Sequence, residues 1–217
     1  WAGLVGAGFA VFCFDHIGFG VRSEHGRRFY ERYEDWSLLG KMVTDARAAI
    51  DELTKVRWID PARVCATGYA LGGKIALFTA ALDDRISAVS VRCAFAPLRL
   101  CADREPSEGI RHYSHIHGLL PKLGFFESQP SRLPVDYDEI VAAIAPRPVQ
   151  IVAPEMDRYN PVDRVKRSVE ASRRAYALLG AESSLEIESV LDWNRWANYE
   201  SQEVWLTRKA GLPPVPK

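Results

Sequence analysis

The segment RVCATGYALGGKIALFTAAL, residues 63–82, constrains the fold more than any other part of the 217-residue sequence. An apolar run of strand length, Arg63–Thr67, is followed by three glycines within six residues and then by an apolar stretch of helical length, Lys74–Leu82. Gly68 and Gly72 each lie two residues from Ala70, so two backbones can pass close together at a sharp turn. The sequence predicts a strand, a sharp turn and a helix, with Ala70 exposed at the tip of the turn.

Strand-sized apolar runs and stretches of helical periodicity alternate along the rest of the chain. The expected strands are Phe9–Phe14, Arg63–Thr67, Ile86–Cys93, Pro148–Ala153 and Ser184–Val190. The expected helices are the end of a helix at Trp1–Gly8, then Leu38–Val56, Lys74–Leu82, Asp138–Ile144, Val162–Leu179 closed by Gly180, and Tyr199–Lys209. This alternation predicts an α/β fold with a mostly parallel sheet. We expect one domain over residues 1–217, with an insertion or lid-like loop at about 96–137.

Composition narrows the possible partners. Hydrophobic residues make up 47% of the chain and charged residues 26%, as in ordinary globular proteins. The 28 basic residues balance the 28 acidic ones, and no apolar run approaches the roughly 20 residues of a membrane span, so we expect neither nucleic acid nor membrane as a partner. The chain opens on Trp1, without an initiator methionine and inside an apolar pattern, as a fragment would.

Three cysteines, Cys13, Cys65 and Cys93, fall inside apolar, strand-like runs. Free cysteine in such a run behaves as a small core residue, so we expect these thiols to be reduced and buried. Reduced cysteines fit a cytoplasmic location, although the sequence does not fix the compartment.

The turn around Ala70 resembles the nucleophile elbow of the α/β-hydrolase superfamily, Gly-x-Ser-x-Gly, with alanine at the serine position. The competing interpretation, a phosphate-binding turn, requires a hydroxyl residue where Ile75 follows Lys74. FDHIGFG (14–20) is similar to the loop after the fourth strand of that superfamily, and PRPVQIVAPEMDRYNP (146–161) to the strand and loop of its triad acid. The runs 70–86 and 139–154 look most like the acetyl-xylan-esterase and dienelactone-hydrolase branch.

This resemblance implies a three-layer α/β-hydrolase-type sheet whose N-terminal strands are missing from the chain. It also implies carboxylic ester hydrolysis through a Ser-His-Asp acyl-enzyme, on a small-molecule ester that can carry a sugar, with no cofactor and no metal. In that scheme position 70 is the nucleophile, Asp157 is the acid, and the backbone N–H of Leu71 holds the oxyanion.

The histidine of such a triad is absent from its expected place, because the sequence around Leu191–Trp196 reads LDWNRW and no histidine follows His117. The cluster RHYSHIHG admits three interpretations: structural loop histidines, a displaced catalytic base, or a His-x-x-His-x-His metal site. Being two residues apart, His115 and His117 face opposite ways in an extended loop, and we select His115 as the base. The candidates for substrate binding are His16, His117, Tyr69 and Trp193, each of which can also be structural.

Ala70 itself has two explanations. It is either an engineered Ser→Ala substitution in an esterase or the natural residue of a pseudoenzyme that binds a small molecule or carbohydrate, or acts as a scaffold. In both cases the chain as written is expected to be inactive, because loss of a triad nucleophile costs on the order of a million-fold in turnover. Oligomeric state stays open.

Overall fold

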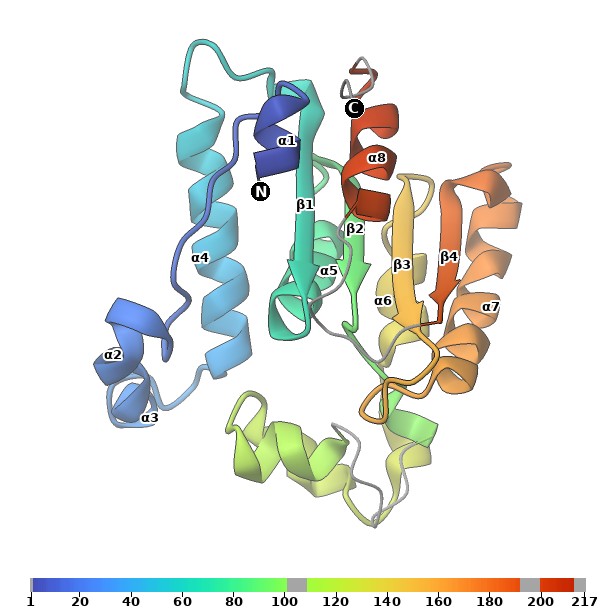
Figure 1. The fold of residues 1–217 in the computed structure, drawn as a ribbon. Helices are drawn as coiled ribbons and strands as arrows, with labels where there is room; N and C mark the ends of the chain where they lie inside the picture. Colours follow the sequence, from blue (N-terminus) through green and yellow to red (C-terminus); the bar gives the residue numbers. More distant parts are fainter. Residues whose placement is uncertain (1, 101–108, 192–199, 213–217) are drawn as a thin grey trace.

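The computed structural model describes residues 2–100, 109–191 and 200–212. Within them, four parallel strands form one sheet in the order of the chain (Figure 1). The strands are β1 (Val64–Tyr69), β2 (Ile86–Arg92), β3 (Val149–Pro154) and β4 (Leu185–Val190). The α/β fold with a parallel sheet, predicted from the alternation of strands and helices, is confirmed.

The helices lie mainly between the strands, as expected of βαβ units. The α-helices are α1 (Ala2–Gly6), α2 (Ser23–Arg27), α3 (Phe29–Arg32), α4 (Leu38–Leu53), α5 (Leu71–Leu82), α6 (Tyr137–Ala142), α7 (Val162–Leu178) and α8 (Glu200–Lys209). The short 3₁₀ segments are η1 (Gly20–Arg22), η2 (Pro61–Arg63), η3 (Leu98–Leu100), η5 (Pro121–Phe126), η6 (Pro130–Arg132) and η7 (Glu182–Ser184), and η4 (His112–Ile116) is a single π-helical turn. None of the helices in the described ranges is long and apolar enough to cross a membrane.

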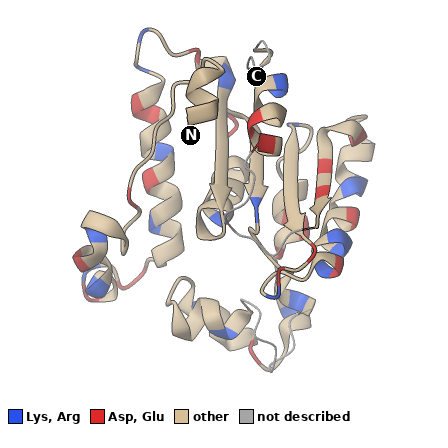
Figure 2. Cartoon of the chain, in the orientation of Figure 1, with Lys and Arg blue, Asp and Glu red and all other residues tan. Residues whose placement is uncertain are grey.

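Helices cover both faces of the sheet and make three layers. On one face, α5 packs against β1 and β2, α4 packs on α5, and α6 and α7 continue the layer to β3 and β4. On the other face, α8 packs on β2 and β3, and α1 packs on α8. Strand β2 is buried from both sides, since Val89 and Val91 join the large core while Ala88 joins the small one with Leu4 and Trp205. Residues of both charge signs occur along α4 and α7 (Figure 2).

Local signals in the sequence account for several helix ends. Ser37 caps α4 by accepting a hydrogen bond from Gly40 N, and Asp136 forms a capping box with Glu139 at the start of α6. Gly180, with φ of +65°, follows the end of α7 as predicted. Helix α5 begins at Leu71, three residues before the predicted start, because the turn at Ala70 leads directly into it.

The predicted strand Phe9–Phe14 is wrong. These residues pair with no strand among those described, and the side chains of Phe12 and Phe14 are 56% and 36% exposed. The prediction that Cys13 is buried fails for the same reason, because its segment has no strand beside it to complete a covered sheet. Cys65 is half-buried and Cys93 is buried, and all three of these cysteines are free thiols as predicted.

In its described residues, the long irregular segment contains only short helical turns of three to six residues, η3 to η6. Several of its apolar side chains still belong to the main core, among them Ile110, Tyr113 and Leu133. Backbone pairing also fixes it to α4, since Leu39 N donates to Leu119 O at 3.0 Å. The described part of this segment therefore packs against the sheet domain rather than projecting from it.

The close approach at the turn generates a test. A Cβ added at Gly68 would lie 2.5 Å from the backbone nitrogen of Gly73 and closer still to the carbonyl group of Gly72, where no flexible side chain can yield. We expect Gly68→Ala to lower the free energy of unfolding by about 2–3 kcal/mol in urea denaturation. Gly72→Ala is the matched control, because a Cβ there meets nothing within 4 Å, and we expect a change within about 0.5 kcal/mol. Equal losses in the two variants would contradict the packing argument.

Candidate functional site

Ala70 occupies the tip of the turn between β1 and α5, at the carboxyl edge of the sheet, as the glycine spacing predicts. Its backbone has φ of +48° and ψ of −117°, a conformation that an L-residue other than glycine rarely adopts. Two hydrogen bonds hold it there: Ala70 N donates to Arg92 O on β2 at 3.0 Å, and Lys74 N donates to Ala70 O at 3.1 Å. Such strain persists only where the surrounding structure imposes it, and it is concentrated at functional sites.

A pocket of about 430 Å³ opens in front of Ala70. Three parts of the chain line it: the turn and first residues of α5, the loop before α4, and the segment that carries the histidines. Its lining residues are Gly18, Phe19, Ser23, Gly26, Arg27, Leu38, Ala70, Leu71, Lys74, Tyr113, His117 and Leu119. Among these described residues the ionisable side chains are basic or phenolic, and none is a carboxylate.

Lys74 is a pocket residue that the sequence reasoning did not select. It lies four positions after Ala70, one turn into α5, and helical residues at that spacing share a face. The residue is 2% exposed, and its Nζ lies 5.5 Å from the centre of the Tyr113 ring. Tyr113 in turn shares a hydrogen bond of 2.7 Å with the hydroxyl of Tyr137, whose ring stacks on Phe95. The spacing from Ala70 was the signal in the sequence that could have identified Lys74.

Of the two candidate histidines, the structure brings His117 to the pocket and leaves His115 outside its described lining. The side chain of His115 is 61% exposed, with Nδ1 2.7 Å from Ser114 Oγ and 3.9 Å from Glu127 Oε2. The π-helical turn η4 is the physical reason. In it, His117 N donates to His112 O at 2.8 Å, and the centres of those two tilted rings lie 5.9 Å apart, so residues five positions apart share a side.

Asp157 lies three residues beyond β3, and the residue is 8% exposed. Its Oδ1 accepts hydrogen bonds from Tyr159 N and Asn160 N at 2.9 and 3.2 Å, and its Oδ2 accepts one from Asn160 Nδ2 at 3.0 Å. The same Asn160 amide donates to Cys93 O at the end of β2. Asp157 therefore orders its own loop beside a small cavity of about 10 Å³, and it is not among the described residues that line the pocket of Ala70.

The remaining candidates are dispersed. Leu71 lines the pocket and carries the first backbone N–H after the turn. His16 faces a different cavity, beside β1, where burial lowers the pKa of its imidazole. Tyr69 ends β1 and is half-buried without contributing to the described lining of the pocket. Trp193 lies outside the described residues. No group of three or more histidine, cysteine or acidic side chains in the described part of the chain could hold a metal ion.

A parallel sheet whose first strand ends in a strained, glycine-flanked turn beneath a pocket defines an α/β-hydrolase fold. The family model for glucuronyl esterase of fungi matches residues 3–180, and the chain belongs to this family of carbohydrate ester hydrolases. The resemblance to the α/β-hydrolase superfamily is thereby confirmed. The finer resemblance to acetyl-xylan esterases and dienelactone hydrolases receives no specific support.

Relatives agree with this assignment. The chain is 30% identical over 185 residues to YtaP of Bacillus subtilis, a protein named as a hydrolase, and covers 56% of it. It is 22% identical over 147 residues to carbohydrate esterase MZ0003 of an unknown prokaryotic organism, covering 34% of that protein. These alignments take in 82% and 67% of the present chain.

Solved structures agree in fold. The glucuronoyl esterase catalytic domain from Hypocrea jecorina superposes with a TM-score of 0.72 at 19% identity, over 90% of this chain and 58% of that one. The glucuronoyl esterase from Sporotrichum thermophile gives 0.72 at 20% identity, over 88% and 58%. The chain thus spans little more than half the length of these proteins.

The backbone at position 70 generates a second test. Glycine adopts a positive φ without steric cost, so we expect Ala70→Gly to raise the free energy of unfolding by about 1 kcal/mol. Ala181, which precedes a short helical turn at φ of −119°, supplies the control. Ala181→Gly should lower the same quantity by about 0.5–1 kcal/mol, because glycine there only adds freedom to the unfolded chain. Destabilisation of equal size in both variants, measured by urea denaturation, would show that position 70 is unstrained.

Proposed function

We propose that this chain supplies the substrate pocket of a carbohydrate carboxylic-ester hydrolase, and that with Ala70 at the nucleophile position it binds a uronic acid ester without cleaving it. The observation that carries the proposal is the placement of Ala70: a strained elbow whose side chain faces a pocket lined by Lys74 and His117. The family match supports an ester of a carbohydrate as the substrate class.

A structure of a relative supports the substrate in more detail. A serine-to-alanine mutant of the glucuronoyl esterase from Sporotrichum thermophile was solved in complex with methyl 4-O-methyl-β-D-glucopyranuronate, and it shares the fold of this chain at a TM-score of 0.66 over 80% of its length. An esterase without its serine can therefore still hold its ester. We infer the same behaviour for the present chain and take a methyl uronate as the probe.

The chemistry follows from the residues around the elbow. A hydroxyl at position 70 would attack the ester carbonyl, and the N–H of Leu71 would donate to the oxyanion. The imidazole of His117 lies in the same pocket and would take the proton, whereas His115 is turned toward solvent. Lys74 adds a buried positive charge on the side of the helix that faces the pocket. Asp157 enters the proposal as the acid on the family resemblance alone, and in the structure its carboxylate orders its own loop.

The second candidate is a natural pseudoenzyme, which would bind its ligand and stay inactive even with a serine at position 70, and one observation favours it. The described lining of the pocket contains no carboxylate to orient a histidine. A protein that lost both the serine and the acid would keep a pocket fit for binding alone. We also propose one domain over residues 1–217, with the 96–137 segment as an insertion whose residues Tyr113, His117 and Leu119 line one side of the pocket.

The test places a serine hydroxyl at position 70. In the full-length gene product, we expect Ala70→Ser to hydrolyse methyl 4-O-methyl-glucuronate at a rate on the order of 10³-fold or more above the unmodified protein, because the nucleophile is the missing group. Ala62→Ser, an exposed position in the turn before β1, is the matched control and should gain nothing. Hydrolysis is followed by titration of the released acid, and binding of the ester to both proteins by calorimetry.

Substituting each of the two histidines then tests which of them takes the proton from the hydroxyl at position 70. In the Ala70→Ser background, His117→Ala should abolish the gain, and His115→Ala should leave most of it. Ester binding without any hydrolysis by Ala70→Ser would favour the binding protein. Failure of both proteins to bind the ester would reject the proposed substrate.

A further inference from the structure

Two walls of the pocket at the elbow are joined by the hydroxyl of Tyr30. This hydroxyl donates a hydrogen bond to Gly118 O at 2.5 Å and accepts one from Leu38 N at 3.1 Å. Leu38 lines the pocket from the start of α4. Gly118 directly follows His117, which lines the pocket from the segment 112–119, called here the histidine segment. Tyr30 is outside the described lining, so it joins the two walls without being part of either.

The start of α4 supplies the donors for this link. The first N–H groups of an α-helix have no acceptor within the helix. In α4 the N–H of Leu38 donates to Tyr30, and the N–H of Leu39 donates to Leu119 O at 3.0 Å. The histidine segment is therefore fastened to α4 by two routes, one direct and one through the Tyr30 hydroxyl. Without that hydroxyl, Leu38 N and Gly118 O would both lose a hydrogen-bond partner.

His117 lies between two backbone hydrogen bonds. Its own N–H donates to His112 O at 2.8 Å across the π-helical turn. The next carbonyl along the chain, that of Gly118, is the one that Tyr30 holds. Gly118 has φ of +57°, a left-handed conformation that glycine adopts without steric cost, so the chain can turn directly after His117. Because the side chain of His117 is exposed, its position depends on where these bonds hold the backbone.

Tyr30 is itself held in place by packing. Its ring is half-buried and meets the ring of Phe29 edge-on, with the two centres 5.0 Å apart. Phe29 is 0% exposed and belongs to the main core. Burial also raises the pKa of the Tyr30 phenol, so the hydroxyl keeps its proton at neutral pH and remains a donor. An anchored ring with a protonated hydroxyl can hold a backbone carbonyl at a fixed distance.

We propose that Tyr30 is a positioning residue of the pocket, whose hydroxyl holds the histidine segment against α4 and so sets where the imidazole of His117 stands relative to position 70. The consequence for turnover rests on the proposed function, in which His117 is the base. Tyr30 acts through the backbone of Gly118. A displacement of about 1 Å at a reacting group can lower turnover on the order of 100-fold, so a single hydroxyl outside the lining can matter to the reaction.

Hydrogen exchange in the full-length gene product tests the placement without any catalysis. Tyr30→Phe removes the hydroxyl and keeps the ring, and it should speed exchange of the Leu39 and His117 N–H groups by about 2–10-fold, as expected on losing one hydrogen bond. The N–H of Val89, which donates to a carbonyl beside β3 at 2.9 Å, should change by less than about 2-fold. Tyr33→Phe is the matched control, because Tyr33 follows the same helix and is 42% exposed, and it should change none of the three.

Kinetics in the Ala70→Ser background test the consequence for turnover. Tyr30→Phe should lower kcat for methyl 4-O-methyl-glucuronate by about 10-fold and change KM by less than about 2-fold, because the residues that line the pocket are all retained.

Three results would overturn the proposal: unchanged exchange at Leu39 and His117, an equal acceleration at Val89, or a higher KM with kcat unchanged. If Ala70→Ser hydrolyses no ester, the proposed function fails, and the exchange rates alone decide whether Tyr30 places His117.

Discussion

The contact between Gly68 and the first turn of α5 is the constraint on which the site depends. Strand and helix approach so closely there that no side chain fits at position 68. The chain can make that approach only by reversing direction over a single residue, and this forces Ala70 to a φ of +48°. The same geometry pushes the residue at position 70 out of the sheet edge and into the pocket, with the N–H groups of α5 behind it. An alanine stays in a strained backbone because its neighbours impose the turn.

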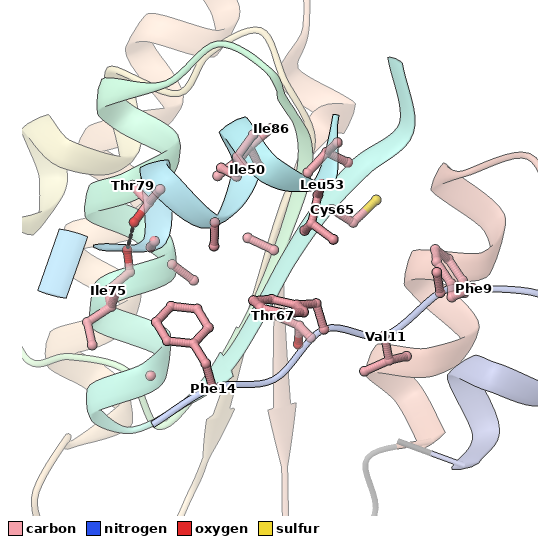
Figure 3. A pocket seen from close by; sticks show the side chains of 18 of the residues that line it. Phe9, Val11, Phe14, Ile50, Leu53, Cys65, Thr67, Ile75, Thr79 and Ile86 are labelled. Carbon is pink, nitrogen blue, oxygen red and sulfur yellow. Dashed lines mark hydrogen bonds between the residues drawn. The ribbon is translucent and has the colours of Figure 1, made fainter. Parts of the chain in front are cut away.

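Strand β1 and helix α5 serve two regions at once. Their carboxyl and amino ends form the elbow, with Leu71 and Lys74 at the pocket, while Gly72 and Ile75 one step along the same helix line the cavity beside β1 (Figure 3). Adjacent residues of α5 thus line the pocket of Ala70 on one side and the cavity beside β1 on the other. A substitution in β1 or α5 that shifts either element therefore changes the walls of both cavities.

Sequence patterns predicted those parts of the fold that are set by local interactions and by burial on two sides. The four paired strands, the helix end at Gly180 and the turn at Ala70 all follow from runs of a few residues. The segment 9–14 reads as a strand for the same reason, but pairing requires a neighbour, and no local pattern shows whether one is present. The histidines are a different case: alternation predicts that only one of His115 and His117 faces inward, and the pocket lining includes His117 and not His115, because a π-helical turn ends just before His117. Lys74 was missed because its importance comes from burial beside Tyr113, which is a tertiary contact.

The pocket in front of Ala70 has a positively charged lining, which does not depend on the residue at position 70. A neutral ester becomes negatively charged as its carbonyl is attacked, and the acid product is an anion at neutral pH. The described lining offers Arg27 and Lys74, together with the amide end of α5, and no opposing carboxylate. Groups of this sign stabilise negative charge at the reacting carbon more than they stabilise the neutral ester. The surroundings of position 70 are thus complementary to the charge that develops during ester cleavage, although the side chain at position 70 is a methyl group, which cannot attack the ester.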